Sequence, residues 1–567
     1  MDALISPERG NWGDRASAWV AAHPRWTLAL AVVLFLGPFL SKPFNMDDPL
    51  FVWTARQIQA HPFNPYGFNV NWYGTASPMW GVTQNPPLGA YYVALAAGML
   101  GWSEMALHFA FLLPALAVIL GTYRLARRFC DRPLLAALAT LFTPVFLVSA
   151  TSLMCDVLML AFWVWAVALW VEGMEGDAFW PLAGAGVLIA LAALTKYFGV
   201  CLVPLLAVCG ALSKRRFGWW AGYLLIPLLA LFAYEWATKT VYQHDLFWKA
   251  AAYASHKSGF FTGARGAAGF TALSFTGGCL GVAIFLAPSL WRTRAWQAFV
   301  GGVPLAAFAL FGEGTLLQPY HWIQGWHRIS LEGQFVFWTI GGALVLALAA
   351  TDVWRGRDAR SWLPGLWVMG TFAFTAEFNW SINGRSILPM APAVGILLAR
   401  RLESRAGANE AVAAVGRRRV VIGLAGSALL ALLVAGSDFL LAAAVRQSAQ
   451  QTYERYGHGG QTVWFQGHWG FQYYLAELGG QAQDKRHPGF RDGDVLAVPL
   501  NNTNLDPPAA PRDAFYVNGP RFLTDMNLYA GAGFYSSADG PLPFIFGHVP
   551  PENVAVYHWQ SGASGKP

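Results

Sequence analysis

The sequence predicts a mainly α-helical, polytopic membrane protein with about thirteen transmembrane helices and a small C-terminal α/β domain. Its 567 residues are 55% hydrophobic and only 12% charged, whereas a soluble domain carries about twice that charged fraction. Long apolar segments recur along the chain, and most approach the roughly 17–25 residues that cross a bilayer. After about residue 445 the composition changes to short apolar runs between turn residues, which predicts a separate domain.

Thirteen apolar segments are predicted to span the membrane. One further apolar segment, 86–101 ("PPLGAYYVALAAGMLG"), is predicted to lie as a helix in the outer membrane interface, where Tyr is enriched. Counting it as a span would place the next basic loop on the outer side. The predicted spans are 26–43, 104–124, 133–152, 157–171, 180–195, 197–213, 217–236, 269–290, 296–312, 332–351, 362–378, 385–400 and 419–444.

The formal net charge of +7 comes from Arg and Lys in short loops, and every second loop is basic. This arrangement indicates membrane orientation rather than a nucleic-acid partner, because basic loops are retained in the cytoplasm. The acidic loop 171–180 ("VEGMEGDAFW") is expected on that side too. The basic residues are Arg9, Arg15 and Arg25; Arg124, Arg127, Arg128 and Arg132; Lys214 to Arg216; Arg292 and Arg294; Arg355, Arg357 and Arg360; and Arg400, Arg401, Arg405 and Arg417 to Arg419.

This alternation predicts the organisation of the chain. Residues 1–25 are a cytoplasmic tail, 26–445 are the transmembrane module, and 45–103 are its first outer loop. Residues 446–567 are expected to form a soluble outer domain with strands at "TVWFQG", "DVLAVPL" and "NVAVYHW" and a short helix at "GFQYYLAEL". The Arg- and Ala-rich composition favours a bacterium, so we expect a multi-pass inner-membrane protein whose C-terminal domain is periplasmic.

Charged residues at the predicted outer ends of spans are candidate site residues, because ionisable groups at membrane depth are costly. Asp47 and Asp48 follow the first span, Asp156 lies near the start of the fourth, and Lys196 connects the fifth and sixth. Arg385 opens the twelfth span. An acidic pair here can also simply cap the next helix. The convergence of carboxylates and cations from distant positions nevertheless favours a site.

These residue types suit a substrate that carries a phosphate. Lys and Arg bind phosphate, and a neighbouring carboxylate can take a proton from an attacking hydroxyl. Transfer of a sugar from a polyprenyl phosphate needs both groups. A single displacement would invert the anomeric centre, by the logic of inverting glycosidases.

The motifs and their order resemble the GT-C membrane glycosyltransferases that use polyprenyl-phosphate sugars, such as the protein O-mannosyltransferases and the lipid A aminoarabinose transferase. The resemblance covers roughly residues 20–445. It rests on Asp47-Asp48 and, in this order, on "QNPPLGAYY", "CDVLML", "LTKYFGV" and "NGRSILPMAPAVGILLARRL".

The resemblance implies roles for individual residues. Asp47 would be the catalytic base, Asp156 would support the site, and Lys196 and Arg385 would bind phosphate, with Tyr197 beside Lys196. The chain departs from the family at two places. It has Asp-Asp where Asp-Glu is usual, and Asn85 where many members have Lys or His before the Pro-Pro. Asn85 would contribute a hydrogen bond but no charge.

Three residues of the aromatic-rich outer loops are further substrate candidates: His256, Lys257 and His321. The histidines are scattered, without the close spacing of zinc ligands, so no metal site is predicted. No cofactor is expected either, since the lipid-linked sugar is a substrate.

The sequence therefore predicts a hexosyl- or pentosyltransferase that uses a polyprenyl-phosphate donor, contacts membrane lipids and modifies a glycan, a lipid or a protein. Two alternatives remain open. A polyprenyl-lipid transporter or flippase would carry its charges near the bilayer midplane and show repeated halves. A polymerase or ligase with a pyrophosphate-linked donor would need more cations. The sugar, the acceptor and the oligomeric state are not specified by the sequence.

Overall fold

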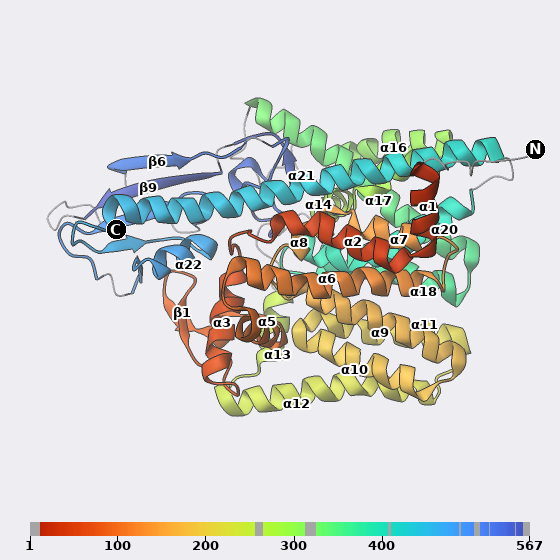
Figure 1. Ribbon diagram of the computed structural model, residues 1–567, viewed down its shortest axis with the longest axis horizontal. Helices are drawn as coiled ribbons and strands as arrows, with labels where there is room; N and C mark the ends of the chain where they lie inside the picture. Colours follow the sequence, from red (N-terminus) through yellow and green to blue (C-terminus); the bar gives the residue numbers. More distant parts are fainter. Residues whose placement is uncertain are drawn as a thin grey trace, which may run out of the picture.

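The computed structural model describes residues 12–255, 265–311, 325–405, 410–486, 489–503, 511–520, 522–549 and 551–559. Long helices run side by side through most of the molecule, and a small sheet lies at one end (Figure 1). The N-terminal half comprises α1 (Trp12–Ala22), α2 (Pro24–Leu36), η1 (Gly37–Phe39), α3 (Asp48–Ala60), β1 (Asn69–Asn71), β2 (Ala76–Pro78), α4 (Met79–Val82), α5 (Leu88–Leu100), α6 (Glu104–Ala126), α7 (Pro133–Leu141), α8 (Pro144–Ala150), α9 (Asp156–Gly176), α10 (Phe179–Thr195), η2 (Tyr197–Cys201), α11 (Leu202–Lys214), η3 (Trp219–Leu224), α12 (Leu225–Tyr242) and α13 (Leu246–Ser255).

The second half of the helical module leads into the C-terminal domain. The module comprises α14 (Arg265–Cys279), α15 (Val282–Leu290), α16 (Thr293–Phe311), α17 (Gly325–Gly356), α18 (Ala359–Ala373), η6 (Phe374–Phe378), α19 (Gly384–Ile387), η7 (Leu388–Met390), α20 (Ala391–Glu403) and α21 (Glu410–Tyr456). The C-terminal domain comprises β3 (Val463–Phe465), α22 (Trp469–Glu477), β4 (Gln481–Ala482), β5 (Val495–Pro499), β6 (Asp513–Val517), β7 (Thr524–Asp525), η8 (Leu528–Ala530), β8 (Ile545–Phe546) and β9 (Glu552–His558).

The predicted mainly helical membrane fold is confirmed. Among the described residues, six helices are long and apolar enough to cross a membrane, or up to eight if each of two bent pairs is one span. The pairs α7–α8 and α14–α15 bend by 65° and 85°. Pro144 opens α8, where its missing N–H and fixed φ favour a helix start and oppose continuation from α7. The other predicted segments are also helical.

Glycine allows two of the long helices to approach closely. A Cβ at Gly277 of α14 would lie 1.9 Å from the Trp338 carbonyl oxygen of α17, and one at Gly342 would lie 2.0 Å from the Leu273 carbonyl oxygen. Both contacts would be severe overlaps. Small residues at a helix interface let backbones pack where no side chain intervenes, so α14 and α17 pack backbone to backbone at this crossing.

The predicted interfacial segment forms the 13-residue helix α5, which is shorter than a full span. Figure 1 shows α5 almost end-on, whereas α6 and α9 lie in the plane of the view. The helix therefore runs across the bundle rather than along it, and it packs on α3 and α6.

Ion pairs gather the predicted cytoplasmic loops at one end of the bundle. Glu172 and Glu175 of the acidic loop pair with Arg124 and Arg128 at 2.7 and 2.6 Å. Arg360 lies 3.9 Å from Glu175. Such exposed pairs add little stability, but they show that the acidic loop lies among the basic ones, as expected.

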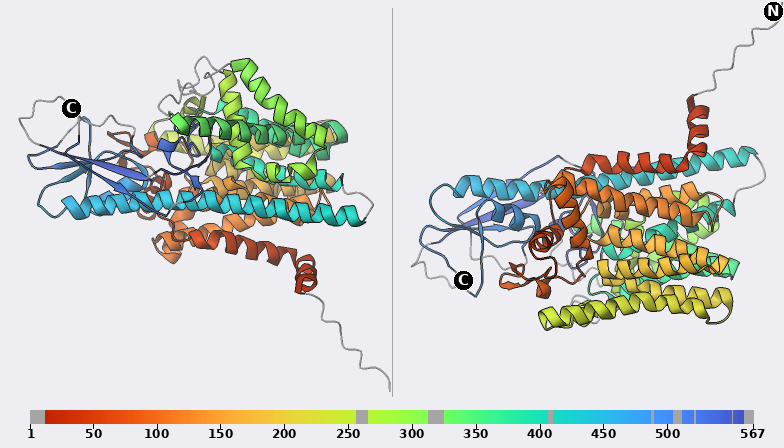
Figure 2. Two further views of the ribbon diagram at one scale, coloured as in Figure 1. Left: turned by 90° about the horizontal axis from the view of Figure 1, so that it is seen from above. Right: turned by 60° about the horizontal axis from the view of Figure 1, so that its bottom comes forward.

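The C-terminal domain contains the predicted strands and helix. Its five-stranded sheet has the order β4-β3-β5-β9-β6, with β3 parallel to β4 and β5 and the remaining pairs antiparallel. Helix α21 continues past residue 445 to Tyr456 and packs on α22, so one helix joins the module to the domain (Figures 1 and 2). The core under the sheet is formed by Ala444, Val445, Ala449, Val463, Phe465, Phe471, Leu475, Val495, Ala497, Phe515, Val517, Val554 and Val556.

A second part of the C-terminal region, residues 524–546, returns to the helical module. We call it the return segment. The Gly384 N–H donates to the Phe534 carbonyl at 2.7 Å, and the Ser274 hydroxyl donates to the Pro541 carbonyl at 2.7 Å. Several of its apolar side chains belong to the core of the module. The predicted boundary at residue 445 therefore does not separate two independent cores.

Candidate active site

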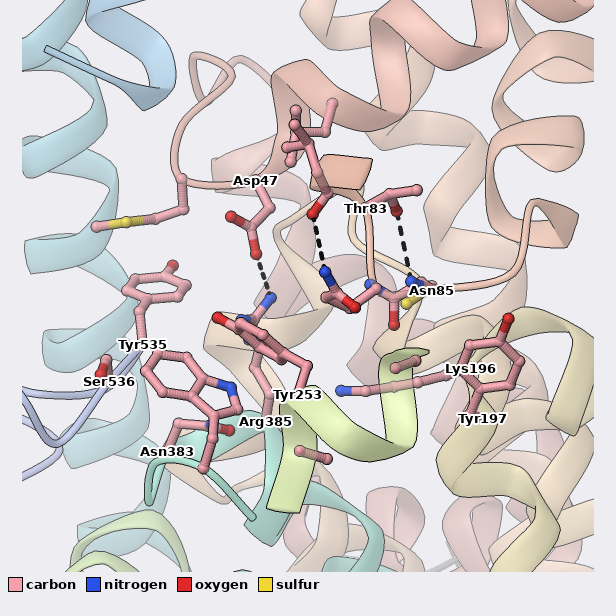
Figure 3. Close-up of a pocket in the computed structure, with 18 of the residues that line it drawn as sticks. Asp47, Thr83, Asn85, Lys196, Tyr197, Tyr253, Asn383, Arg385, Tyr535 and Ser536 are labelled. Carbon is pink, nitrogen blue, oxygen red and sulfur yellow. Dashed lines mark hydrogen bonds and ion pairs between the residues drawn. The ribbon is translucent and has the colours of Figure 1, made fainter. Parts of the chain in front are cut away.

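A cavity of about 660 Å³ lies between the helical module, the first outer loop and the C-terminal region. Its lining includes five of the residues singled out in the sequence: Asp47, Asn85, Lys196, Tyr197 and Arg385. Figure 3 shows these side chains around one space, although they come from positions up to 338 residues apart. We call Asp47, Lys196 and Arg385 the charged wall.

Asp47 and Arg385 form the first ion pair of the charged wall. The Arg385 Nη1 atom lies 2.7 Å from the Asp47 Oδ2 atom (Figure 3). Asp47 precedes α3 but makes no capping hydrogen bond to it, so its carboxylate points to Arg385 instead. The preceding Met46 has φ +50°, a left-handed turn that re-aims the chain. The cap interpretation of the acidic pair therefore does not describe Asp47.

A helix cap positions the backbone of Arg385, while the guanidinium keeps N–H donors that make no hydrogen bond. Asn383 caps α19 by accepting a hydrogen bond from the Ser386 N–H at 2.9 Å, which starts the helical turn that carries Arg385. The buried Arg385 Nε atom has no hydrogen-bond partner in the described parts of the chain. A guanidinium has five N–H donors, so an oxygen-rich ligand can still bind to it.

Lys196 and Asp156 form the second ion pair, with 2.5 Å between the Nζ and Oδ1 atoms. Helix α10 ends just before Lys196, whose backbone is extended. Asp156 begins α9; its side chain is 2% exposed and is not part of the cavity lining. Figure 3 shows the Lys196 ammonium group pointing into the cavity, and the ion pair with Asp156 holds that group in place.

Asp48 lies outside the cavity lining although it neighbours Asp47 in sequence. It is 1% exposed and accepts hydrogen bonds from the Asn45 N–H, the Ser152 hydroxyl and the Leu153 N–H, at 3.1, 2.9 and 2.8 Å. Burial is the main reason that its pKa rises to about 6. Asp48 therefore connects the start of α3, next to Asp47, to the loop before α9.

Asn85 and Tyr197 line the cavity without charge. The Asn85 carbonyl accepts a hydrogen bond from the Tyr66 hydroxyl at 2.7 Å, and its N–H lies 3.4 Å from the Thr83 hydroxyl oxygen. The Tyr197 ring packs edge-on against Phe247, with 5.3 Å between centroids. His256, Lys257 and His321, the remaining candidates, lie outside the described residues.

Sequence reasoning missed the residues that close the cavity from the C-terminal side. We call Trp469, Asn501, Asn502, Thr503, Tyr535, Ser536 and Asp539 the C-terminal wall. Tyr535 and Ser536 belong to the return segment, and Figure 3 shows them on the side opposite Lys196 and Tyr197. No motif in this region pointed to a site, because these residues act together only through the tertiary fold.

A buried ion pair behind the C-terminal wall was also missed. Lys42 pairs with Asp438 of α21, and their side chains are 1% and 0% exposed. Tyr535 donates a hydrogen bond to the other Asp438 oxygen at 2.9 Å. Lys42 and Asp438 stand at the edge of, or within, apolar segments, which is the signal that could have found them. The network ties the first span, α21 and the return segment together.

Comparison with known proteins relates this site to glycosyl transfer. The dolichyl-phosphate-mannose-protein mannosyltransferase family matches residues 84–237, a range that contains Asn85, Asp156, Lys196 and Tyr197. ArnT from Cupriavidus metallidurans bound to undecaprenyl phosphate has a similar structure, with a TM-score of 0.51. The alignment covers 86% of this chain and 94% of ArnT at 15% identity. The chain has the GT-C fold. The resemblance inferred from the motifs is thereby confirmed.

A further solved structure is similar over much of the chain. The apo Archaeoglobus fulgidus oligosaccharyltransferase has a TM-score of 0.48 at 13% identity, over 84% of this chain and 66% of that protein. No curated protein sequence matches the chain.

Proposed function

We propose that this protein is a glycosyltransferase that moves a sugar from a polyprenyl phosphate to an acceptor hydroxyl at the outer face of the membrane. The observation that carries the proposal is the charged wall, in which two cations and a carboxylate from distant segments meet in one cavity. The matched mannosyltransferase family and the ArnT fold support the same reaction class. ArnT was solved with undecaprenyl phosphate, which supports a lipid-phosphate donor here.

The two cations that line the cavity keep N–H donors that a bound anion could use. Arg385 pairs with Asp47, and Lys196 pairs with Asp156. Lys196 has three N–H donors and Arg385 has five, and these pairs use only some of them. A donor phosphate would therefore find charge-assisted hydrogen bonds on both cations. Among the described residues that line the cavity, Lys196 and Arg385 are the only Lys and Arg. Two cations suit one phosphate group better than two, which argues against a pyrophosphate donor.

The reaction follows from these positions. The acceptor oxygen attacks the anomeric carbon while Asp47 takes the acceptor proton. The bond between the anomeric carbon and the phosphate oxygen breaks, and the phosphate leaves with the bonding electron pair. Lys196 and Arg385 stabilise the charge that develops on the phosphate. A single displacement of this kind inverts the anomeric centre.

The location of the cavity favours the outer face. Helix α10 runs from the end of the bundle with the basic loops to Lys196 at the cavity, so the two features lie at opposite ends. Basic loops remain in the cytoplasm, and this rule supports an outer position for the cavity, which in a bacterium is the periplasmic face. A transporter would instead carry such charges near the midplane.

The test is sugar transfer by the purified chain in lipid bilayers, with a panel of polyprenyl-phosphate sugars as donors. We expect the wild type to consume one donor and Asp47→Asn to lose about 10²–10⁴-fold in rate, since general-base catalysis is worth that much. Asp131→Asn is the matched control, because Asp131 is exposed in a basic loop. Wild-type transfer by the Asp47→Asn protein would show that Asp47 is not the catalytic base. If the wild type consumes none of the donors, the proposed transferase function is wrong.

A further inference from the structure

The C-terminal wall contains a buried amide whose hydrogen bonds are unmade. Asn502 follows β5, lines the cavity and is 2% exposed. Neither its Oδ1 nor its Nδ2 atom has a hydrogen-bond partner within the described parts of the chain. Buried polar groups are almost always paired, and an unpaired one calls for an explanation. A ligand in the cavity that offers both a donor and an acceptor would satisfy this amide.

A carboxyl group of the return segment lines the same cavity. Asp539 makes no ion pair and no side-chain hydrogen bond with any described residue, in contrast to Asp47. Burial raises the pKa of Asp539 to about 7. A carboxyl group without a cation accepts hydrogen bonds from hydroxyl groups but does not attract an anionic ligand.

The backbone around Asp539 is fixed. The Asp539 N–H donates to the Ser536 carbonyl at 3.0 Å, and the Ser537 N–H donates to the Ile382 carbonyl at 2.8 Å. A Cβ at Gly540 would lie 1.8 Å from the Gly531 carbonyl oxygen, so only glycine allows the two arms of the segment to meet. Ile382 precedes the turn that carries Arg385. The Ser537–Ile382 hydrogen bond therefore connects the C-terminal wall to the charged wall.

Trp469 adds an aromatic surface to the C-terminal wall. Its backbone has φ +57°, a left-handed conformation that bulky residues rarely adopt. Strained backbone of this kind is concentrated at functional sites. The surrounding structure maintains this strained conformation at the start of α22, where Trp469 lines the cavity.

We propose that Asn502 and Asp539 form the acceptor subsite and that the acceptor is a neutral polyhydroxylated compound, a sugar unit of a glycan. The amide offers a donor NH₂ group and an acceptor oxygen side by side, which matches adjacent sugar hydroxyls. The C-terminal wall holds no Lys or Arg among the described residues, so it does not suit an anionic acceptor. This inference rests on the proposed function for the reaction, but the subsite itself is a binding site that can be tested separately.

The experiment measures equilibrium binding of neutral methyl disaccharides of glucose, galactose and mannose to the full chain in lipid nanodiscs. We expect one of them to bind, and Asn502→Ala and Asp539→Asn each to weaken that binding about five- to tenfold, the loss expected for one or two hydrogen bonds. Undecaprenyl phosphate should bind to both variants as to the wild type, because neither residue belongs to the charged wall.

Asn553→Ala is the matched control. The Asn553 Oδ1 atom is buried and without a partner among the described residues, but Asn553 does not line the cavity. Its disaccharide affinity should equal that of the wild type. Asn502→Ser, with the thermal unfolding midpoint of each variant, separates loss of the subsite from loss of the fold.

Three results would overturn the subsite. They are the absence of disaccharide binding by the wild type, unchanged binding in both variants, and binding of a Ser/Thr-containing peptide that depends on Asn502 in place of the sugar. Failure of the proposed function is a different result. If no donor is consumed but disaccharide binding depends on Asn502 and Asp539, the proposed binding subsite is supported and the proposed transferase function is contradicted.

Discussion

The two walls of the cavity differ in charge, in origin and in how they are held. The charged wall comes from the first outer loop and the ends of α10 and α19, and its cations are paired with carboxylates. The C-terminal wall comes from the start of α22, the turn after β5 and the return segment, and the side chains of Asn502 and Asp539 have no hydrogen-bond or ion-pair partner among the described residues. This contrast underlies the two proposals, in which an anion binds at the charged wall and sugar hydroxyl groups bind at the C-terminal wall.

The largest expected effect comes from removing the Lys196–Asp156 ion pair, which tests whether the two walls bind different ligands. Deleting Lys196 alone would strand the buried Asp156 carboxylate, which is destabilising in itself. The double change Lys196→Met and Asp156→Asn avoids that charge. We expect undecaprenyl phosphate affinity to fall about ten- to hundredfold, since hydrogen bonds to charged groups contribute about 1.5–3 kcal/mol.

Disaccharide binding provides the internal comparison for the same double variant and should be unchanged. Lys239→Gln is the control, because the Lys239 side chain is 61% exposed and pairs with Asp245 outside the cavity lining. Equal loss of lipid and disaccharide binding in the double variant would mean that the two walls are not separate sites.

The neighbours Asp47 and Asp48 sharpen the comparison within the first outer loop. Asp48→Asn replaces an acceptor with an NH₂ group at the Asn45 N–H, so we expect a loss of about 1–3 kcal/mol in the free energy of unfolding. Transfer per folded molecule should persist. Asp47→Asn should show the opposite pattern, with stability kept and transfer lost. Denaturation in mixed micelles and the transfer assay together distinguish the two variants. An inactive but stable Asp48→Asn protein would show that Asp48 has a catalytic role.

The last prediction concerns the sheet behind the C-terminal wall. Glu552 of β9 is fully buried, which raises its pKa to about 8. Its folded pKa lies above the unfolded value, so the folded state holds the proton more tightly. Stability should therefore fall as the pH rises from about 4.5 to about 8 and then level off.

Glu552→Gln should remove that part of the pH dependence, because the amide oxygen still accepts from the Asn501 and Asn553 N–H groups. Thermal unfolding midpoints of both proteins between pH 5 and pH 8 test this. Identical slopes in the two series would show that Glu552 does not carry the effect.

Periodic and compositional signals were enough for the helices and for most of the sheet. Each of the thirteen apolar segments contains helix in its described part, although six described helices, or up to eight with the bent pairs, are long and apolar enough to cross a membrane. The three predicted strands appear as β3, β5 and β9. Strand β6 was missed because "DAFYV" follows a Pro-rich stretch and resembles a loop. The sequence also did not predict the bends between α7 and α8 and between α14 and α15. Hydropathy does not detect a bend within an apolar segment.

The sequence by itself determined the membrane-embedded helices, the alternation of basic loops and the charges that now line one wall. These are local properties, set by hydrophobicity and by the cost of burying a charge. Only the tertiary structure decided which carboxylate meets which cation, why Asp47 faces the cavity while Asp48 is buried, and that the return segment closes the site. Those outcomes depend on contacts between residues hundreds of positions apart, such as Arg385 with Asp47 and Gly384 with Phe534, and no local pattern encodes such pairings.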